Sequence, residues 1–270
     1  MTAQHLARID LDAVRERLEA AVREAGDAIV EVLGRPTFRV GHKPGQGPVT
    51  EADYAADDIL RRRLVPLIEG ARWLSEESRE EAPLIGGEPT WVVDPLDGTQ
   101  EFLRGLPEYG VSVGLFVDDR LVLGAVELPP SREVLSGLIA GGRRESRRNG
   151  APLPILANDG IVGRVVVSRS DFERRRIAYR IPYPVHPLGS AAVKLVQSAT
   201  VDTDVYFSTG PRSVWDVAGG VAVLEGVGGA AVTLDGEALT LSPQRIDVPP
   251  YVAGAPEDGR ALLRGLGLLA

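Results

Sequence analysis

Residues 91–105 read WVVDPLDGTQEFLRG, an apolar run that ends in two carboxylates, a glycine and a hydroxyl. Pro95 has no backbone donor and ends a strand, so we expect Asp94 and Asp97 on a turn where their side chains can converge. The Leu96 carbonyl between them can point the same way. Hard cations such as Mg²⁺ prefer oxygen ligands of this kind. The ordinary alternative is a structural turn, because Asp, Pro and Gly all favour turns.

Gly98 and Thr99 extend this prediction from a metal ion to a phosphate. Glycine lets the backbone approach a ligand closely, and threonine supplies a hydroxyl. If a helix begins near Thr99, its free N–H groups favour a phosphate at the same place. Aspartyl phosphatases place one residue, not two, between their aspartates, and an EF-hand needs alternating ligands and a final glutamate. Neither spacing occurs here.

Two further acidic stretches lie before this turn in the chain. WLSEES (73–78) ends in Glu76 and Glu77, of which one can ligate a metal while the other points to solvent; a solvated acidic turn is the alternative. In PVTEAD (48–53), Asp53 follows Thr50 by three residues, which resembles a helix capping box. Each stretch alone has an ordinary structural explanation.

A fourth stretch, WDVAGG (215–220), places Asp216 where a helix should begin, and an N-capping aspartate would explain it equally well. The small residues Ala218, Gly219 and Gly220 would let that helix pack tightly against a neighbour.

The composition restricts the classes of partner. The formal net charge is −8, so a nucleic-acid polymer would be repelled except at a local basic site. The chain has no cysteine, which excludes disulfides and thiol nucleophiles. No apolar run approaches the roughly 18 residues of a membrane span, and no signal peptide is evident. We therefore expect a cytoplasmic protein that acts on a small molecule.

Apolar spacing and turn residues predict a layered α/β fold with two helices at the front and a large mixed sheet. A helix over 10–33 should start at Asp10 and stop at Gly34 and Pro36. The other expected elements are a loop over 35–49, a helix over 50–68, an antiparallel meander of strands (72–75, 91–94, 111–117, 121–128 and 133–140), a turn at 149–150, a strand at 164–170, and helices over 189–199 and 214–227.

Taken together, the four acidic stretches resemble the inositol monophosphatase superfamily of Mg²⁺-dependent, lithium-sensitive phosphomonoesterases. PVTEAD, WLSEES, DPLDGTQEF and WDVAGGVAVLEGVGG match family blocks in the right order, and SRS (168–170), GSAAVK (189–194) and TLDGEAL (233–239) add support. The resemblance implies an αβαβα sandwich of the inositol monophosphatase and fructose-1,6-bisphosphatase type, two or three Mg²⁺ ions per site, and a homodimer.

The resemblance also assigns roles to residues and to the two halves of one compact unit. An N-terminal half, residues 1–160, would carry most metal ligands, and a C-terminal half, residues 161–270, would carry the last ligand and the substrate-recognition residues. The implied metal ligands are Glu76, Asp94, Asp97, Asp216 and the Leu96 carbonyl. Asp53 and Thr99, with Glu76, would orient the attacking water, and the backbone of Gly98 and Thr99 would hold phosphate. His5, His42 and His186 occupy no family catalytic position, and we expect them at the surface or in loops.

The substrate is less well defined. Inositol monophosphatases usually read DGT-T-N-F, whereas Gln100, Glu101 and Phe102 are closer to the DGT-(Lys/Arg)-E-F of 3′(2′),5′-bisphosphate nucleotidases. In that case Ser190, Lys194 and Arg212 would recognise the nucleotide or its second phosphate, although Lys194 as a solvated helix residue is an equal alternative. Gln100 lacks the usual positive charge. Inositol-1-phosphatase, fructose-1,6-bisphosphatase and histidinol-phosphate phosphatase activities stay open, as does a catalytically inactive metal-binding relative.

Overall fold

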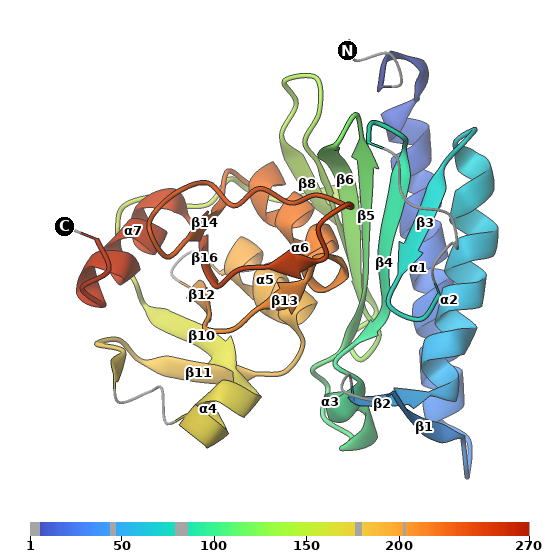
Figure 1. The fold of residues 1–270 in the computed structure, drawn as a ribbon, viewed down its shortest axis with the longest axis horizontal. Coiled ribbons are helices and arrows are strands. Elements are labelled where there is room, and N and C mark those ends of the chain that lie inside the picture. Colours follow the sequence, from blue (N-terminus) through green and yellow to red (C-terminus); the bar gives the residue numbers. More distant parts are fainter. Residues whose placement is uncertain (1–5, 44–46, 79–85, 176–179, 202–203, 270) are drawn as a thin grey trace.

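The computed structural model describes residues 6–43, 47–78, 86–175, 180–201 and 204–269. These residues form five layers in the order helix, sheet, helix, sheet, helix (Figure 1). Helices α1 and α2 cover one face of a seven-stranded sheet, α5 and α6 lie between that sheet and a five-stranded one, and α7 packs on the outer face. Three clusters of buried hydrophobic side chains fill the spaces between the layers. The predicted αβαβα class is confirmed.

The helices are α1 (Leu11–Leu33), α2 (Glu51–Leu64), α3 (Thr99–Leu103), α4 (Arg169–Arg175), α5 (Ala191–Thr200), α6 (Val214–Gly226) and α7 (Pro256–Gly265), with short 3₁₀ turns at Leu6–Arg8 and Val65–Leu67. The large sheet contains, in spatial order, β3 (Arg72–Ser75), β4 (Thr90–Asp97), β5 (Gly110–Val117), β6 (Arg120–Leu128), β7 (Glu133–Leu138), β8 (Glu145–Arg148) and β9 (Ala151–Pro152). The small sheet contains β11 (Val185–Leu188), β10 (Arg164–Ser168), β12 (Asp204–Ser208), β16 (Tyr251–Gly254) and β14 (Ala230–Thr233). Two-stranded ribbons pair β1 (Val40–Lys43) with β2 (Gly47–Thr50) and β13 (Arg212–Ser213) with β15 (Asp247–Val248).

The two front helices begin at the predicted caps. The Asp10 side chain accepts a hydrogen bond from the Ala13 backbone at the start of α1, and both hydrogen bonds of the capping box between Thr50 and Asp53 are present. Helix α2 ends at Leu64, earlier than expected, and a 3₁₀ turn containing Pro66 follows. Val65 keeps helical backbone angles, but Pro66 has no backbone N–H and so cannot continue the helical hydrogen bonds.

Two predictions about strands are wrong. Residues 35–49 were expected to form a loop, but β1 and β2 pair within that span as an antiparallel ribbon that includes Pro48. Proline is tolerated in such a ribbon because its missing N–H can face the unpaired edge. Strand β3 runs parallel to β4, whereas the meander was expected to be antiparallel throughout; the antiparallel order holds from β4 to β9.

Helix α6 lies unusually close to the large sheet because glycines remove side chains from the contact. A Cβ atom on Gly137 of β7 would lie 2.0 Å from the Ala222 carbonyl oxygen, and one on Gly219 would lie 2.5 Å from the Ala125 carbonyl oxygen. Neither position accommodates a larger residue without movement of backbone. This contact fixes the height of α6 above the sheet and therefore the position of Asp216 in its first turn.

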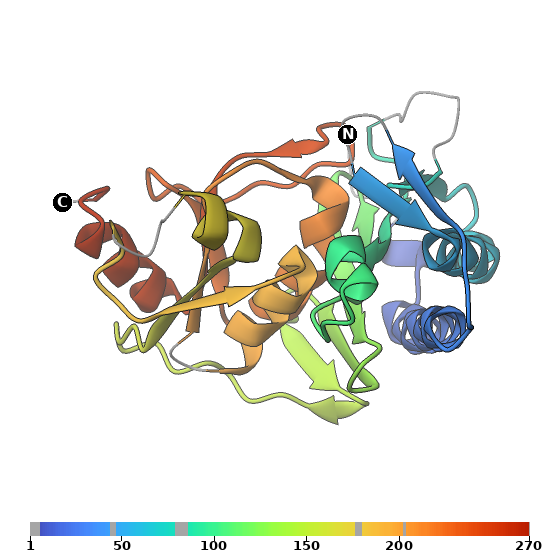
Figure 2. The same cartoon turned by 90° about the horizontal axis from the view of Figure 1, so that it is seen from below.

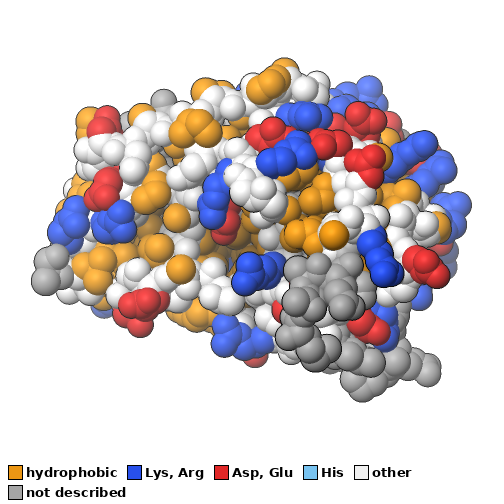
Figure 3. All heavy atoms as spheres, turned by 90° about the horizontal axis from the view of Figure 1, so that it is seen from above, with side chains coloured by type: hydrophobic (Ala, Val, Ile, Leu, Met, Phe, Trp, Pro, Cys, Tyr) orange, Lys and Arg blue, Asp and Glu red, His pale blue; other side chains and the backbone are white. Residues whose placement is uncertain are grey.

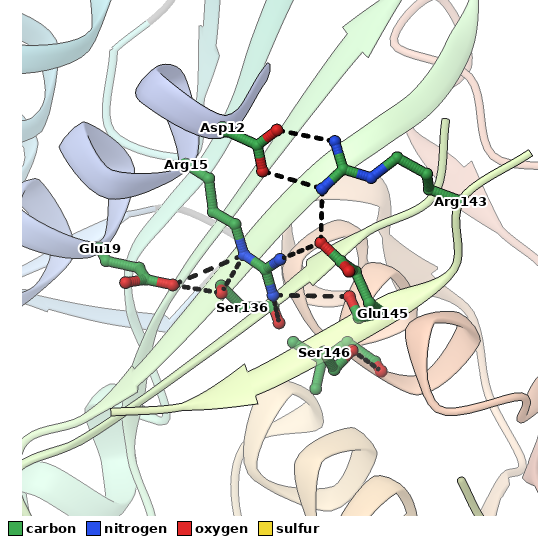
Figure 4. A network of polar contacts seen from close by, with 8 residues as sticks. Asp12, Arg15, Glu19, Ser136, Arg143, Glu145 and Ser146 are labelled. Atoms are coloured by element: carbon green, nitrogen blue, oxygen red, sulfur yellow. Dashed lines mark hydrogen bonds and ion pairs between the residues drawn. The ribbon is translucent and has the colours of Figure 1, made fainter. Parts of the chain in front are cut away.

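A buried arginine ties α1 to the far strands of the same sheet (Figure 4). Arg15 is fully buried, and its guanidinium donates to the Ser136 hydroxyl at 2.7 Å, to the Ser136 carbonyl at 2.9 Å and to Glu145 at 3.0 Å. Glu19 on α1 and Arg143 before β8 extend the network. Because a buried charge needs such partners, the network fixes how α1 crosses β7 and β8.

Exposed charges of both signs lie interspersed on the face seen from above (Figure 3). Surface ion pairs among the described residues include Arg63 with Glu24 and Arg35 with Glu31 and Glu51. In the part of the chain described above, no helix is both long enough and apolar enough to cross a membrane.

Candidate metal and phosphate site

A cavity of about 490 Å³ lies between the end of β4, helix α3 and the first turns of α5 and α6. Seen from below, α3 lies beside these two helices and the β1–β2 ribbon (Figure 2). The structure brings almost all the predicted site residues to this cavity. Its lining includes Glu76, Asp94, Leu96, Asp97, Gly98, Thr99, Ser190, Lys194, Arg212 and Asp216.

Three carboxylates from distant parts of the sequence converge in the cavity. Glu76 follows β3, Asp94 lies on β4 and Asp216 is the third residue of α6, yet one oxygen of each lies within 4.8 Å of the others. Asp94 is only 2% exposed. Oxygen donors packed this closely suit a hard divalent cation such as Mg²⁺.

The electrostatics of this cluster favour the binding of a cation. Burial raises the pKa of Asp94 well above its usual value, and the charges of Glu76 and Asp97 raise it further. Burial likewise raises the pKa of Glu76 and of Asp216, and again the neighbouring carboxylates add to the effect. Like charges in a low-dielectric pocket disfavour ionisation, and a bound cation removes that repulsion.

Asp97 lies beside the three-carboxylate cluster and is held from the other half of the chain. Its Oδ2 accepts hydrogen bonds from the Ser190 hydroxyl and the Ala192 backbone N–H, both at 2.7 Å. A bulge in β4 between Asp94 and Asp97 turns both side chains into the cavity. Leu96 between them also lines the cavity, and its carbonyl oxygen lies 3.1 Å from the Thr99 hydroxyl, which has one proton to share between this carbonyl and Asp53.

Asp53 is not in the lining of the cavity, but it caps α2 and contacts Thr99, which is. One carboxylate oxygen accepts from the Thr50 backbone and hydroxyl at 2.7 and 2.6 Å, which caps α2. The other accepts from the Thr99 hydroxyl at 3.1 Å, so the capping residue also orients a hydroxyl at the cavity wall. Burial raises the pKa of Asp53, although hydrogen bonds from Thr50 and Thr99 oppose the rise.

The backbone conformation at position 98 requires glycine. Its φ is +99°, and a Cβ atom there would lie 2.7 Å from the Glu108 carbonyl oxygen. Glycine adopts this conformation without strain. Helix α3 begins at the next residue, Thr99, as predicted, and is only five residues long.

The prediction for Glu77 is wrong. Its side chain does not point to solvent but is 2% exposed, and it forms an ion pair with Lys43 at 2.5 Å. Lys43 also approaches Glu76 at 3.4 Å, so one lysine from β1 holds both glutamates of the pair. Because Lys43 lies in the span predicted to be a loop, the sequence contained no signal for this contact.

The residues proposed for substrate recognition are fixed by different contacts. Lys194 is not solvated, which excludes that alternative: it is 2% exposed and its ammonium donates to the carbonyls of Leu188, Gly189 and Ser190. Ser190 caps α5 and donates to Asp97. Lys194 therefore lies at the cavity wall with its donors taken by backbone, and burial lowers its pKa.

Arg212 lines the cavity from β13. Its guanidinium donates to the Tyr206 hydroxyl at 3.3 Å and lies 3.8 Å from Asp171. Tyr206 is fully buried, so Arg212 is held from behind while its side chain stays partly exposed. This arrangement leaves Arg212 well placed to meet an anionic group.

Several cavity residues were not assigned a role from the sequence. Ser168 and Ser170, whose hydroxyls lie 2.9 Å apart, and Gln100 and Glu101 of α3 also line the cavity. The SRS block was the only signal for the serines. Of the histidines, His42 is exposed on β1 and His186 is half-buried on β11, so both lie in strands, while His5 is outside the described residues.

A two-sheet α/β sandwich with clustered carboxylates at one cavity defines a metal-dependent hydrolase of phosphate esters, and comparison with known proteins identifies the group. The chain belongs to the Inositol monophosphatase family, whose profile matches residues 10–262. It is a phosphoric monoester hydrolase that depends on a divalent metal.

Individual relatives agree on the family but differ in their names. The chain is 28% identical over 239 residues to "Inositol monophosphatase 3" of Solanum lycopersicum, an alignment that covers 84% of this chain and 88% of the relative. It is 30% identical over 239 residues to "3'(2'),5'-bisphosphate nucleotidase CysQ" of Salmonella typhimurium, covering 87% and 96%. Among solved structures, the extragenic suppressor protein suhB from Bartonella henselae superimposes with a TM-score of 0.76 at 23% identity, covering 94% of this chain and 98% of that one.

Proposed function

We propose that the protein is a Mg²⁺-dependent 3′(2′),5′-bisphosphate nucleotidase that converts 3′-phosphoadenosine 5′-phosphate to AMP. The observation that carries the proposal is one cavity that joins a three-carboxylate cluster to Arg212 and the buried charge of Lys194. A substrate with one phosphate at the metal site and a second at some distance needs positive charge at both places. The 30% identity to a bisphosphate nucleotidase supports the same choice.

In this proposal Glu76, Asp94 and Asp216, with Asp97 and the Leu96 carbonyl, hold two or three Mg²⁺ ions. Bound Mg²⁺ neutralises the phosphate dianion and lowers the pKa of a coordinated water. The backbone N–H groups of Gly98 and Thr99 hold the phosphate oxygens.

The hydroxyl of Thr99 donates to Asp53, so its oxygen can accept a hydrogen bond from the attacking water. Glu76 would take part in the same orientation. Water would then attack the phosphorus in line with the leaving oxygen and without a phosphoenzyme: a new P–O bond would form as the ester P–O bond breaks, and a proton from the water would end on the leaving alcohol.

Inositol-1-phosphatase is the second candidate. It is favoured by the 28% identity to an inositol monophosphatase and by Gln100 and Glu101 in the cavity wall, where Glu101 would repel a second phosphate. Burial raises the pKa of Glu101, which weakens this repulsion.

A phosphate-release panel with Mg²⁺ tests the proposal. It compares 3′-phosphoadenosine 5′-phosphate, inositol 1-phosphate, fructose 1,6-bisphosphate and histidinol phosphate, each with and without Li⁺. We expect the highest kcat/KM for the bisphosphate nucleotide and inhibition by Li⁺ at about millimolar concentration. A higher kcat/KM for any other ester would replace the proposed substrate with that one.

Arg212 gives a sharper test of the second phosphate. Arg212→Gln should raise KM for 3′-phosphoadenosine 5′-phosphate about tenfold, the cost of roughly 1.4 kcal/mol of lost charge-assisted hydrogen bonding, and change KM for inositol 1-phosphate little. Arg264→Gln, on the exposed side of α7, serves as the control. An equal rise for both esters would place Arg212 at the shared phosphate instead.

We also propose a homodimer, for which size-exclusion chromatography should give twice the chain mass of 28.8 kDa.

A further inference from the structure

The turn that carries Glu76 is held by another carboxylate that does not line the cavity. Backbone hydrogen bonds join Ser75 to Ser78 across the turn at 3.0 Å and Glu76 to Val93 of β4 at 3.1 Å. The two flanking serine hydroxyls both donate to Asp57, to one oxygen each, at 2.5 Å. Asp57 therefore clamps the turn on both sides of the glutamate pair.

Asp57 is placed for this contact by its position on α2. It lies one helical turn after Asp53, on the same face of the helix, and is 7% exposed. The adjacent Asp58 is on the opposite side, with its side chain 69% exposed in a surface pair with Arg62. Trp73 donates its indole N–H to the Ser78 hydroxyl at 3.1 Å, so a residue of β3 also holds the Ser78 side of the turn.

We infer that Asp57 is a positioning residue for the metal site: it holds the Ser75–Ser78 turn so that Glu76 stays beside Asp94 and Asp216. The inference rests on the proposed role of Glu76 as a metal ligand. One oxygen of Glu76 lies within 4.8 Å of oxygens of Asp94 and Asp216, so these like charges repel one another and, without a cation, the side chain is driven to leave the cluster. A rigid turn removes that freedom and lowers the cost of assembling the ligands when metal binds.

The arrangement also links two functions to one helix. Asp53 orients the Thr99 hydroxyl, and Asp57 fixes the turn of Glu76, so α2 sets both positions at once. Because Asp57 acts through hydrogen bonds, a neutral acceptor of the same shape should replace it in part, whereas a methyl group should not.

Calorimetric titration of the metal-free protein with Mg²⁺ tests this role without any substrate. Asp57→Ala should raise the Kd for Mg²⁺ about tenfold, as found when partners of metal ligands are removed. Asp57→Asn should restore the Kd to within about threefold of the wild type, and Asp58→Ala should leave it unchanged. A purely structural role would lower Tm in Asp57→Ala without changing the Kd, and an Asn variant as weak as the Ala variant would contradict positioning by hydrogen bonds.

A double-mutant cycle separates this inference from the proposed function. Glu76→Gln alone should weaken Mg²⁺ binding; if it does not, the metal role of Glu76 is wrong, whatever Asp57 does. If it does, Asp57→Ala should add little in the Glu76→Gln background, and a full additional tenfold loss there would overturn the inference. Should Asp57→Ala fail to fold, Ser75→Ala removes one of the two hydroxyls at a buried site and must raise the Kd in the same direction.

Discussion

Asp97 connects two distant parts of the chain through a single carboxylate. It lies at the end of β4, but its Oδ2 accepts from Ser190 and Ala192 at the start of α5. One oxygen therefore holds α5, and in the proposed function the other ligates a cation. An amide at this position can keep the contact with α5 only by presenting its uncharged NH₂ group, which cannot ligate a metal, to the cavity.

We expect Asp97→Asn to lower kcat by at least about a hundredfold, because it weakens metal ligation and the activation of water. Steady-state kinetics over a range of Mg²⁺ concentrations measure the effect. Ser190→Ala is the matched comparison, since it removes one hydrogen bond to the same oxygen and should cost much less. A rate near that of the wild type in Asp97→Asn would exclude Asp97 from the site.

Glu127 is a buried carboxylate outside the site. It lies on β6 against Gly26 of α1, is 2% exposed, and its Oε2 has no hydrogen-bond partner among the described residues. Burial raises the pKa of Glu127 to about 8; the charge of Asp27 adds to the rise, and Arg23 and Arg132 oppose it. The folded protein therefore binds this proton more tightly than the unfolded chain does.

Protonation of Glu127 makes the free energy of unfolding depend on pH. Stability from the bound proton is complete below the unfolded pKa of 4.5 and is lost as pH rises towards 8. Glu127→Gln removes this loss, so its free energy of unfolding should equal that of the wild type near pH 4.5 and exceed it by about 4 kcal/mol at pH 8. Urea titrations at both pH values measure the difference. A constant difference between the two proteins would show that Glu127 does not titrate in this range.

At the scale of elements, α6 illustrates how packing positions a ligand. Its contact with the large sheet depends on glycine, so Gly219→Ala must push the helix outward and should cost about 1–3 kcal/mol of stability. The same shift should weaken Mg²⁺ binding, because Asp216 lies one turn earlier on the helix.

Gly259→Ala in α7 is the control for that prediction. A Cβ there would meet only Val252 at 3.5 Å, an ordinary contact, and alanine has the higher helix propensity. Chemical denaturation should therefore show Gly259→Ala as neutral or stabilising. If Gly219→Ala were equally neutral, the close approach of α6 would not be a constraint.

The elements also show what the sequence could predict. Helices α1, α2 and α6 carry strong apolar patterns and caps, and each was located to within a few residues because those signals are local. The β1–β2 ribbon was missed because each strand has only four residues, β1 is largely exposed, and β2 begins with Gly47 and Pro48. The parallel pairing of β3 was missed because pairing depends on where the chain returns, which local patterns do not record.

In the site, too, local sequence signals were recognised and contacts between distant parts of the chain were not. Asp94, Asp97 and Gly98 are recognisable because they are adjacent in sequence and their spacing has a chemical reason. Asp57 was overlooked although a spacing of four residues from Asp53 places both on one helix face. The pairing of Lys43 with Glu77 had no local signal at all, since 34 residues separate them.

At the scale of the whole molecule, the cavity lies between segments from both sheets. Glu108, which precedes β5, forms an ion pair with Arg169 at the start of α4 and accepts from the Gly189 backbone at 2.7 Å. This contact joins the segment after α3 to the start of α4, which carries Ser170, and to the residues just before α5, where Ser190 is the N-cap. The width of the cavity is therefore set by contacts between the halves as well as within them.

The concentration of carboxylates at this junction has a cost for the whole fold. In EDTA, Asp94, Glu76 and Asp216 repel one another when ionised, and their raised pKa values mean that stability falls as pH rises from about 4 towards 8. Mg²⁺ at about a hundred times its Kd should restore about 2.7 kcal/mol at pH 8, and less at pH 6, where protons compete with the metal.

Asp216→Asn should change the Tm in opposite directions in EDTA and in Mg²⁺. The amide oxygen can still accept from the Ser213 backbone, as Asp216 does at 2.9 Å, so the start of α6 is preserved while one repelling charge is lost. We expect the variant to have a higher Tm than the wild type in EDTA at pH 8, and a lower Tm than the wild type with Mg²⁺. Thermal unfolding under both conditions measures this. A variant less stable than the wild type in EDTA would mean that Asp216 supports the fold by itself rather than through a bound cation.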